Sequence, residues 1–248
     1  KMPNVLLQTL VRETNLWGYR PYPKNIIEHV ISSVDIDVWR CFSFLNDVRN
    51  MRTVAEVVMK RGRLFQPAIS FTQADWTTNE YFLKLVREIV DLCGGTDEII
   101  LCVKDMAGVG SPKRMHSLFD AIKQAFPDLV LQYHRHATDG LALPAILAAA
   151  QAGASIIDVE EDSLTRFFGQ APLLSVASFL EESGMNVHLN TRAADDAVQK
   201  VRDWIGHYEW AESPFKGFDH GVIMHRMPGG AFPSSFEQAQ KGGFLHLM

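Results

Sequence analysis

Residues 98–134, EIILCVKDMAGVGSPKRMHSLFDAIKQAFPDLVLQYH, contain the pattern that decides the fold class. The apolar runs at its two ends, 98–103 and 129–134, are nearly continuous, as expected of parallel strands that are covered on both faces. Between them, residues 113–126 place apolar side chains at helical spacing, and Pro112 favours a helix start there. The stretch therefore predicts a strand–helix–strand unit.

The same alternation extends in both directions from this unit. The predicted strands span residues 5–11, 38–44, 64–71, 98–103, 129–134 and 155–159. The predicted helices span residues 23–34, 49–61, 79–93, 113–126, 142–152 and, after the last strand, 193–210. Repeated units of this kind predict an α/β fold with a parallel sheet. Periodicity leaves open a doubly wound sheet or a (β/α)8 barrel, but the glycines at 108 and 110 lack the third glycine of a dinucleotide fingerprint.

Composition excludes several classes of protein. The 248 residues include 24 Lys+Arg and 29 Asp+Glu, so the net charge of −5 gives no basic excess for binding nucleic acid. No run approaches the roughly 18 apolar residues of a membrane span, and the first residues do not resemble a signal peptide. Cys41, Cys93 and Cys102 are too few and too scattered for a disulfide framework. We therefore expect a cytoplasmic protein without a membrane span.

Polar side chains follow the predicted strands at their carboxyl ends. In chain order they are Arg12, Asn46, Asp47, Thr72, Gln73, Lys104, Asp105, His134, His136, Asp158, Glu160 and Glu161. Barrel enzymes build their active sites at this end of the strands, so six such strand ends in succession favour a site. Simpler roles exist for some of these groups, such as a helix cap at Asp47 or a solvated acidic loop at residues 160–162.

His134 and His136 are the strongest candidates for metal ligands. Alternate residues of a strand point to the same side, so both imidazoles can face one metal ion while Arg135 points away. Neutral imidazole suits zinc and other divalent transition metals. The alternative is a pair of structural histidines with hydrogen bonds to the backbone.

Three further side chains are candidates for the site. Lys104 emerges from a buried strand, and because an ammonium cannot ligate a metal, it needs either catalytic use or chemical modification there; a salt bridge to Asp105 is the structural alternative. Arg12 is suited to holding a carboxylate through two donors, or to an ion pair with Glu13. Tyr19 is either a packed aromatic or a catalytic group.

Several short motifs, taken in order, resemble those of a known family. They are residues 2–4 (MPN), 8–20 (QTLVRETNLWGYR), 39–47 (WRCFSFLND), 104–108 (KDMAG), 134–140 (HRHATDG) and 228–230 (PGG). Together they resemble the biotin-dependent carboxyltransferase domain found in pyruvate carboxylase, the oxaloacetate decarboxylase α subunit and transcarboxylase. Each motif is short, but their order extends over nearly the whole chain.

The resemblance implies a (β/α)8 TIM barrel of the aldolase-like, metal-dependent type and carboxyl transfer between oxaloacetate and biotin, with enolpyruvate as the intermediate. By the family pattern, His134 and His136 ligate a divalent metal, zinc before manganese or cobalt, and carbamylated Lys104 adds an oxygen ligand. Arg12 would hold the keto-acid carboxylate, and Tyr19 would assist at the substrate carbonyl. Biotin would arrive on a separate carrier protein or domain, because no Met-Lys-Met biotinylation signature occurs here. By analogy, the chain would form a homodimer or larger complex.

The resemblance also predicts the domain organisation. The six predicted strands correspond to strands 3 to 8 of the barrel, so that the first two would lie upstream of Lys1. Residues 1–192 would form this barrel domain. Residues 193–248 would form a helical and loop C-terminal extension that is rich in loops from residue 217.

Two departures from the family pattern bear on the substrate. Ser43 stands where the family usually has aspartate, and the acidic run 158–163 (DVEEDS) replaces an uncharged one. Added carboxylates such as Glu160 and Glu161 would repel an anionic keto acid unless they point into water or meet a cation.

Two alternative functions follow from these observations. A metal-dependent aldolase-like lyase or acyl-CoA condensing enzyme would share the His-x-His pair but have no modified lysine. An inactive fragment or scaffold subunit of a carboxyltransferase complex would pair with a biotin carrier or a complete barrel, and the acidic run and the missing strands favour it.

Overall fold

The computed structural model describes residues 4–97, 99–165, 168–211 and 217–247. The chain divides into two compact units. The first unit comprises residues 1–104, 117–133 and 152–156, and the second comprises residues 105–116, 134–151 and 157–248. The chain leaves the first unit at the carboxyl ends of three strands, directly after Lys104, Tyr133 and Ile156. Each unit is described by itself below.

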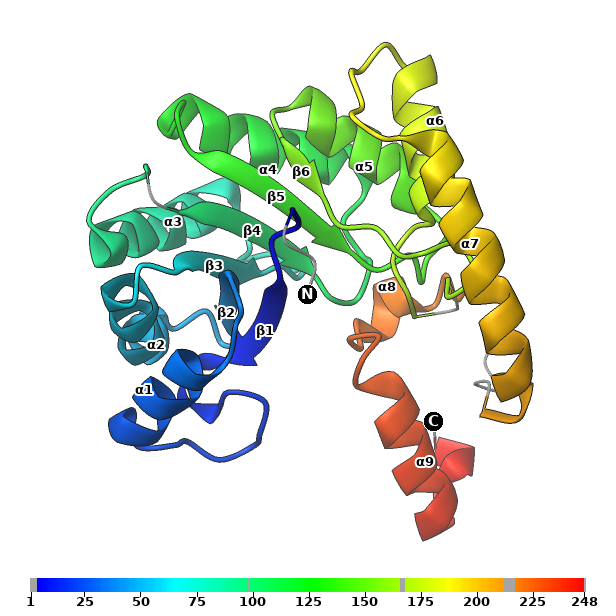
Figure 1. Ribbon diagram of the computed structural model, residues 1–248, viewed down its shortest axis with the longest axis horizontal. Helices are drawn as coiled ribbons and strands as arrows, with labels where there is room; N and C mark the ends of the chain where they lie inside the picture. Colours follow the sequence, from blue (N-terminus) through cyan, green and yellow to red (C-terminus); the bar gives the residue numbers. More distant parts are fainter. Residues whose placement is uncertain (1–3, 98, 166–167, 212–216, 248) are drawn as a thin grey trace. The chain divides into compact units, whose positions relative to one another are not determined.

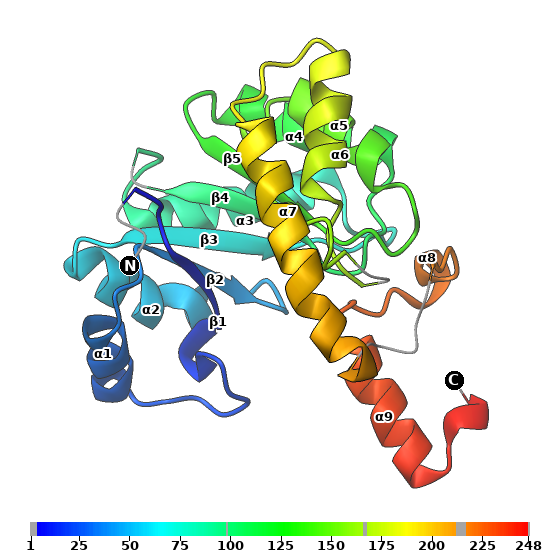
Figure 2. The same ribbon diagram turned by 45° about the vertical axis from the view of Figure 1, so that its right-hand side comes forward.

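The strands form one sheet whose order follows the sequence (Figures 1 and 2). They are β1 (Gln8–Arg12), β2 (Val38–Ser43), β3 (Leu64–Ser70), β4 (Ile100–Asp105), β5 (Val130–Arg135) and β6 (Ile156–Ile157). The first four pair in parallel, with Gln8 beside Val38 in β1 and β2 and Ala68 beside Cys102 in β3 and β4. A parallel neighbour needs a crossover connection, and a helix lies between each strand and the next.

Helices alternate with these strands and then follow them. Their bounds are α1 (Lys24–Ser33), α2 (Val48–Lys60), α3 (Asn79–Cys93), α4 (Pro112–Ala125), α5 (Ala142–Gln151), α6 (Leu173–Glu182), α7 (Thr191–Ile205), α8 (Val222–His225) and α9 (Phe232–Gly242), with short 3-10 turns η1 (Glu13–Asn15), η2 (Gly206–Ala211) and η3 (Leu245–Leu247). Local chemistry sets several ends. The Thr78 hydroxyl accepts a hydrogen bond from the Tyr81 N–H, and the Ser111 hydroxyl accepts one from the Arg114 N–H, so both residues cap a helix.

The core of the first unit lies between the sheet and the helices that follow its strands. Strand β2 is buried throughout, including Trp39, as expected of a strand covered on both faces. Helix α2 buries one stripe that includes Met51, Val54 and Val58, and the Phe71 and Phe82 rings stack with their centroids 5.6 Å apart. Burying each such side chain contributes about 1.5–3 kcal/mol before the cost of ordering it.

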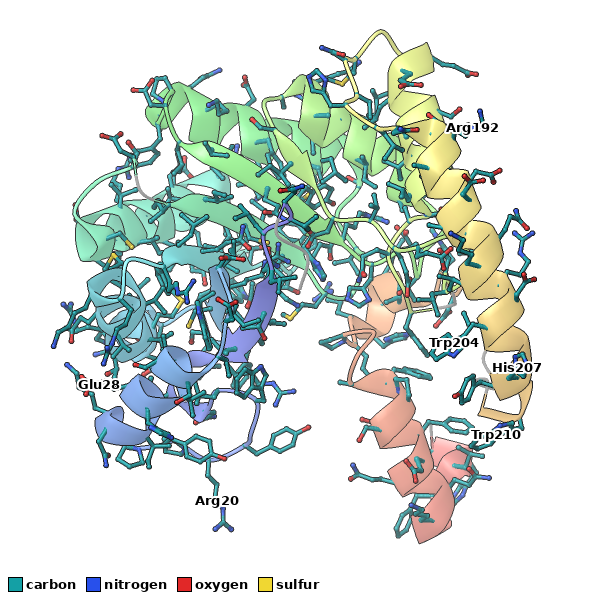
Figure 3. The ribbon with its side chains drawn as sticks, in the orientation of Figure 1. Arg20, Glu28, Arg192, Trp204, His207 and Trp210 are labelled. Carbon is teal, nitrogen blue, oxygen red and sulfur yellow. The ribbon has the colours of Figure 1, made fainter. Side chains whose placement is uncertain are left out.

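The second unit contains the carboxyl-terminal helices. Helix α5 packs with α6, and α6 packs with α7, and these helices bury small and aliphatic side chains, among them Ala149, Val176 and Val198. Trp204 lies near the end of α7 (Figure 3), and its ring centroid is 5.0 Å from that of Tyr208 in η2.

Most predicted elements are confirmed, with ends shifted by one to three residues. The predicted helix over 79–93 matches α3, whereas the one over 193–210 was too long because the α-helix ends at Ile205 and continues as a 3-10 turn. The segment from residue 217, which was expected to be rich in loops, also contains the helices α8 and α9, and Pro233 stands in the first turn of α9. Glu98, Met2 and Pro3 lie outside the described residues.

Candidate functional site

His134 and His136 come together at the end of β5, within the second unit. Their ring centroids are 5.2 Å apart, as the two-residue period of a strand predicts. His134 Nδ1 lies 2.7 Å from Asp158 Oδ2. An ionised carboxylate only accepts hydrogen bonds, so this partner places the proton of neutral His134 on Nδ1 and the lone pair on Nε2.

The ring of His136 is oriented by a main-chain carbonyl. Its Nδ1 contacts the Phe168 oxygen, which only accepts, and its Nε2 lies 3.4 Å from the side-chain nitrogen of Gln170, which only donates. Both contacts assign the same tautomer, with the proton on Nδ1 and the lone pair on Nε2. Residues 168–170 reach the ring because they run beside the end of β5, where the Ala137 N–H donates to the Gly169 oxygen at 2.8 Å.

Gly229 of the Pro228-Gly229-Gly230 segment lies against the His136 ring. A Cβ atom at Gly229 would stand 2.6 Å from His136 Nδ1 and 3.1 Å from the Phe168 oxygen. The Gly229 N–H donates to the Met106 oxygen at 2.9 Å, which holds the segment in place. The glycine is therefore required by the close approach of the backbone to the imidazole.

Asp105 is fully buried at the end of β4 and organises the turn that follows. Its carboxylate accepts hydrogen bonds from the N–H groups of Gly108 (2.9 Å), Val109 (3.0 Å) and Gly110 (2.7 Å). Because these donors already face a carboxylate, the turn is not a phosphate-binding loop. Burial raises the pKa of Asp105, while the Arg135 charge and the three N–H groups act in the opposite direction.

The acidic run after β6 is not the solvated loop that its composition suggested. A Glu160 carboxylate oxygen accepts the Gln170 N–H at 3.0 Å, Glu161 accepts the Ser163 N–H and hydroxyl, and Asp162 accepts the Leu174 N–H at 3.0 Å in the first turn of α6. The sequence suggested that these carboxylates either point into water or meet a cation. Instead, they accept hydrogen bonds from main-chain N–H groups and, at Glu161, a hydroxyl group of the same unit.

Arg12 and Tyr19 come together in the first unit. The Arg12 guanidinium carbon lies 4.8 Å from the centroid of the Tyr19 ring, and Arg12 Nη1 donates to the Trp17 and Gly18 carbonyls. Tyr19 is 87 % exposed, so its interpretation as a packed aromatic is wrong. The neighbouring Arg20 extends away from the unit (Figure 3). A guanidinium held by one of its nitrogens against an exposed tyrosine keeps further donors for a carboxylate.

Lys104 is buried near the end of β4 in the first unit, with 5 % of its surface exposed. Its Nζ lies 5.1 Å from the centroid of the Phe42 ring, a cation–π distance. Asn46 and Asp47, after β2, have structural roles: Asp47 caps α2, and the Asn46 amide makes two hydrogen bonds to the main chain of Ser70. Ser43 is buried, and its hydroxyl accepts the Asp47 N–H.

Comparison with known proteins identifies the family. The HMGL-like family profile matches residues 37–201, which is more than half of the chain. The chain belongs to the HMGL-like family. It is 31 % identical over 260 residues to mitochondrial pyruvate carboxylase of Mus musculus, covering 98 % of this chain and 21 % of the relative. It is 31 % identical to a pyruvate carboxylase subunit of Methanocaldococcus jannaschii, covering 99 % and 43 %. It is 30 % identical to the methylmalonyl-CoA carboxyltransferase 5S subunit of Propionibacterium freudenreichii, covering 98 % and 48 %.

Solved structures agree with this assignment. The carboxyl transferase domain of Rhizobium etli pyruvate carboxylase with pyruvate superposes with a TM-score of 0.92 at 31 % identity, covering 98 % of this chain and 42 % of that chain. The same domain with pyruvate and biocytin gives a TM-score of 0.91. The resemblance to carboxyltransferase domains and the α/β TIM-barrel architecture with a parallel sheet are thus confirmed. The chain spans about half, or less, of the length of these relatives.

The structure also bears on metal binding and on membrane spans. Among the described residues, no three His, Cys, Asp or Glu side chains are grouped so that they could hold a metal ion. None of the described helices is both long and apolar enough to cross a membrane.

Proposed function

We propose that this chain transfers a carboxyl group between a keto acid of the oxaloacetate–pyruvate pair and biotin held on a carrier. The observation that carries the proposal is the pair of imidazoles at the end of β5, whose ring centroids lie 5.2 Å apart and which are each held through Nδ1, His134 by Asp158 and His136 by the Phe168 oxygen. The relatives support it, because they are pyruvate carboxylases and a carboxyltransferase, and the Rhizobium etli domain was solved with pyruvate and biocytin.

The donor set fits a divalent metal, zinc first. Ligating histidines usually donate their second N–H to a carboxylate or a main-chain carbonyl, and here His134 faces Asp158 while His136 faces the Phe168 oxygen. By the family pattern, a carbamate on Lys104 would supply an oxygen ligand to the metal. Lys104 is buried, and in its neutral form the amine would add carbon dioxide to give the carbamate. When bound, the metal would act as a Lewis acid on the keto oxygen.

The remaining proposed roles belong to side chains of the first unit. Arg12 would bind and orient the keto-acid carboxylate through the guanidinium donors that the Trp17 and Gly18 carbonyls do not use. The Tyr19 hydroxyl would hold a proton at the substrate carbonyl. The ring of Tyr19 against the guanidinium would keep the two groups together, so that a substrate held by Arg12 meets the phenol.

The test uses the full-length protein with oxaloacetate and a biotinylated carrier, and it measures pyruvate formation. We expect His134→Ala and Lys104→Ala each to lower turnover by about 100-fold or more, the scale for removing one group that stabilises the transition state. Lys84→Ala, at an exposed lysine of α3, is the matched control and should retain activity. Turnover that survives both site substitutions would refute the proposed roles.

Two measurements separate this proposal from its alternatives. Chemical trapping followed by mass spectrometry should find a carbamate on Lys104, whereas an unmodified Lys104 in an enzyme that turns over would favour an aldolase-like lyase or condensing enzyme. Metal binding with no turnover of any keto acid, in the presence of the carrier, would favour a scaffold subunit.

A further inference from the structure

Arg135, between the two histidines in the sequence, is a fully buried charge that lies near two carboxylates and two main-chain carbonyls. Its side chain is 0 % exposed. Nη2 lies 2.7 and 2.8 Å from the two carboxylate oxygens of Asp139, Nη1 donates to the His136 carbonyl at 2.9 Å, and Nη2 also lies 3.2 Å from the Gly108 carbonyl. Nε is 3.7 Å from Asp105 Oδ2. Arg135 points away from the histidine rings, as the alternation of the strand predicts, and it contacts their supporting backbone.

These contacts of Arg135 connect two segments of the second unit. One is the turn after β4, which the Asp105 carboxylate organises through the N–H groups of Gly108 to Gly110. The other is the segment after β5, which contains His136. The His136 main-chain N–H donates to the Asp105 main-chain carbonyl at 3.1 Å. The main chain of His136 is therefore held at its N–H by β4 and at its carbonyl by Arg135.

The available space leaves little freedom for this arrangement. Gly108 has a φ of +73°, and a Cβ atom there would stand 2.5 Å from the His136 oxygen. Asp139 also accepts the Leu141 N–H at 2.8 Å just before α5, which ties the Arg135 partner to the start of a helix. Arginine suits the position, because only its planar fork of five donors reaches one carboxylate and two carbonyls together.

We propose that Arg135, paired with Asp139, is a positioning residue that sets the place of the His136 imidazole for metal binding. The inference rests on the proposed metal centre of His134 and His136. Arg135 acts through the His136 main chain, and the Phe168 oxygen fixes the ring. Loss of such outer-sphere partners typically weakens metal binding about 10- to 100-fold.

The experiment titrates the full-length protein with cobalt(II) and records its visible absorption, which reports ligand geometry. Arg135→Gln and Asp139→Asn should each weaken cobalt affinity about 10- to 100-fold and alter the absorption bands of the protein that does bind. Arg135→Lys should weaken it less, because one ammonium replaces part of the fork. Arg40→Gln is the matched control, since Arg40 is also a buried arginine, 3 % exposed and bonded to Gln66. It should lower stability and leave the cobalt spectrum as in the wild type.

The outcomes distinguish this proposal from the proposed function. If His136→Ala abolishes cobalt binding but Arg135→Gln binds with wild-type affinity and spectrum, the positioning role is refuted and the metal centre stands. If the wild type binds no cobalt through these histidines, both are refuted together. Should Arg135→Gln not fold, Asp139→Asn decides alone, because it keeps an oxygen acceptor for Arg135 and removes only the charge; a wild-type spectrum in that variant refutes the role.

Discussion

Substituting Gly229 by alanine adds one methyl group against the ring of His136. The added Cβ would stand 2.6 Å from His136 Nδ1, which is 0.8 Å less than the 3.4 Å at which ordinary contact begins. It would also stand 3.1 Å from the Phe168 oxygen, the acceptor for that same Nδ1. The methyl group therefore meets both ends of the hydrogen bond that fixes the His136 tautomer.

The magnitude follows from how the clash is relieved. Neither the ring nor the Phe168 carbonyl is the far end of a flexible chain, so either the ring moves off its acceptor or the Pro228–Gly230 segment shifts. Extra methyl groups in a packed site cost about 1–3 kcal/mol. If the imidazole moves, its outer-sphere contact with the Phe168 oxygen weakens, and we expect metal affinity to fall about tenfold or more.

The assay combines urea unfolding with cobalt(II) titration of the full-length protein. Gly230→Ala is the matched control because it is the next residue and a Cβ there meets no atom within 4 Å. We expect its free energy of unfolding to stay within about 0.5 kcal/mol of the wild type and its cobalt affinity to be unchanged. Gly229→Ala indistinguishable from Gly230→Ala in both measurements would refute the argument that this backbone supports the imidazole.

Three further predictions concern the first unit. Asn46→Ala removes both amide hydrogen bonds to the Ser70 main chain and should lower the free energy of unfolding by about 1–3 kcal/mol. The control Asn50→Ala, at an exposed residue, should change the free energy of unfolding little. Equal effects of the two substitutions would contradict the assigned role of Asn46. Burial raises the pKa of the Cys41 thiol to about 12 and that of Cys93 to about 11, so iodoacetamide at pH 8 should label neither in the folded protein and both after unfolding, as read by mass spectrometry. The unfolded chain loses these thiol protons near its ordinary pKa of 9.0 while the folded chain keeps them, so the free energy of unfolding should fall as pH rises above about 9; a flat urea midpoint between pH 8 and 10 would contradict this.

Secondary structure was predictable wherever one pattern dominated. Nearly continuous apolar runs identified each of the strands β1 to β6, and Thr78 and Ser111 marked helix starts through local hydrogen bonds. The weakest predictions were for α9 and the 3-10 end of α7. The stretch around α9 contains several glycines and buries none of its residues among those described, so it lacks the periodic apolar face that a sequence pattern detects.

The sequence predicted which residue types form the candidate site better than it predicted which side chains contact one another there. The two-residue spacing of His134 and His136 already places both on one side of a strand, because that spacing is a property of the local backbone. The same alternation sends Arg135 to the other side. Its carboxylate partner Asp139 was missed, because Arg135 ends a strand and Asp139 lies in the turn that follows, where a spacing of four residues predicts no contact.

The sequence alone determined the strand–helix alternation, the shared side of the two histidines and, through its ordered motifs, the family. Only the tertiary structure decided which atoms hold those histidines. Asp158 is 24 residues from His134, Phe168 is 32 residues from His136, and Gly229 comes from a segment still farther along the chain. The sequence suggested that the acidic run of residues 160–162 would repel an anionic substrate. In the tertiary structure these carboxylates accept hydrogen bonds from main-chain N–H groups. The physical reason is range: backbone geometry acts over a few residues and can be inferred from spacing, whereas imidazole tautomers and buried carboxylates depend on partners that only the folded path of the chain brings within about 3 Å.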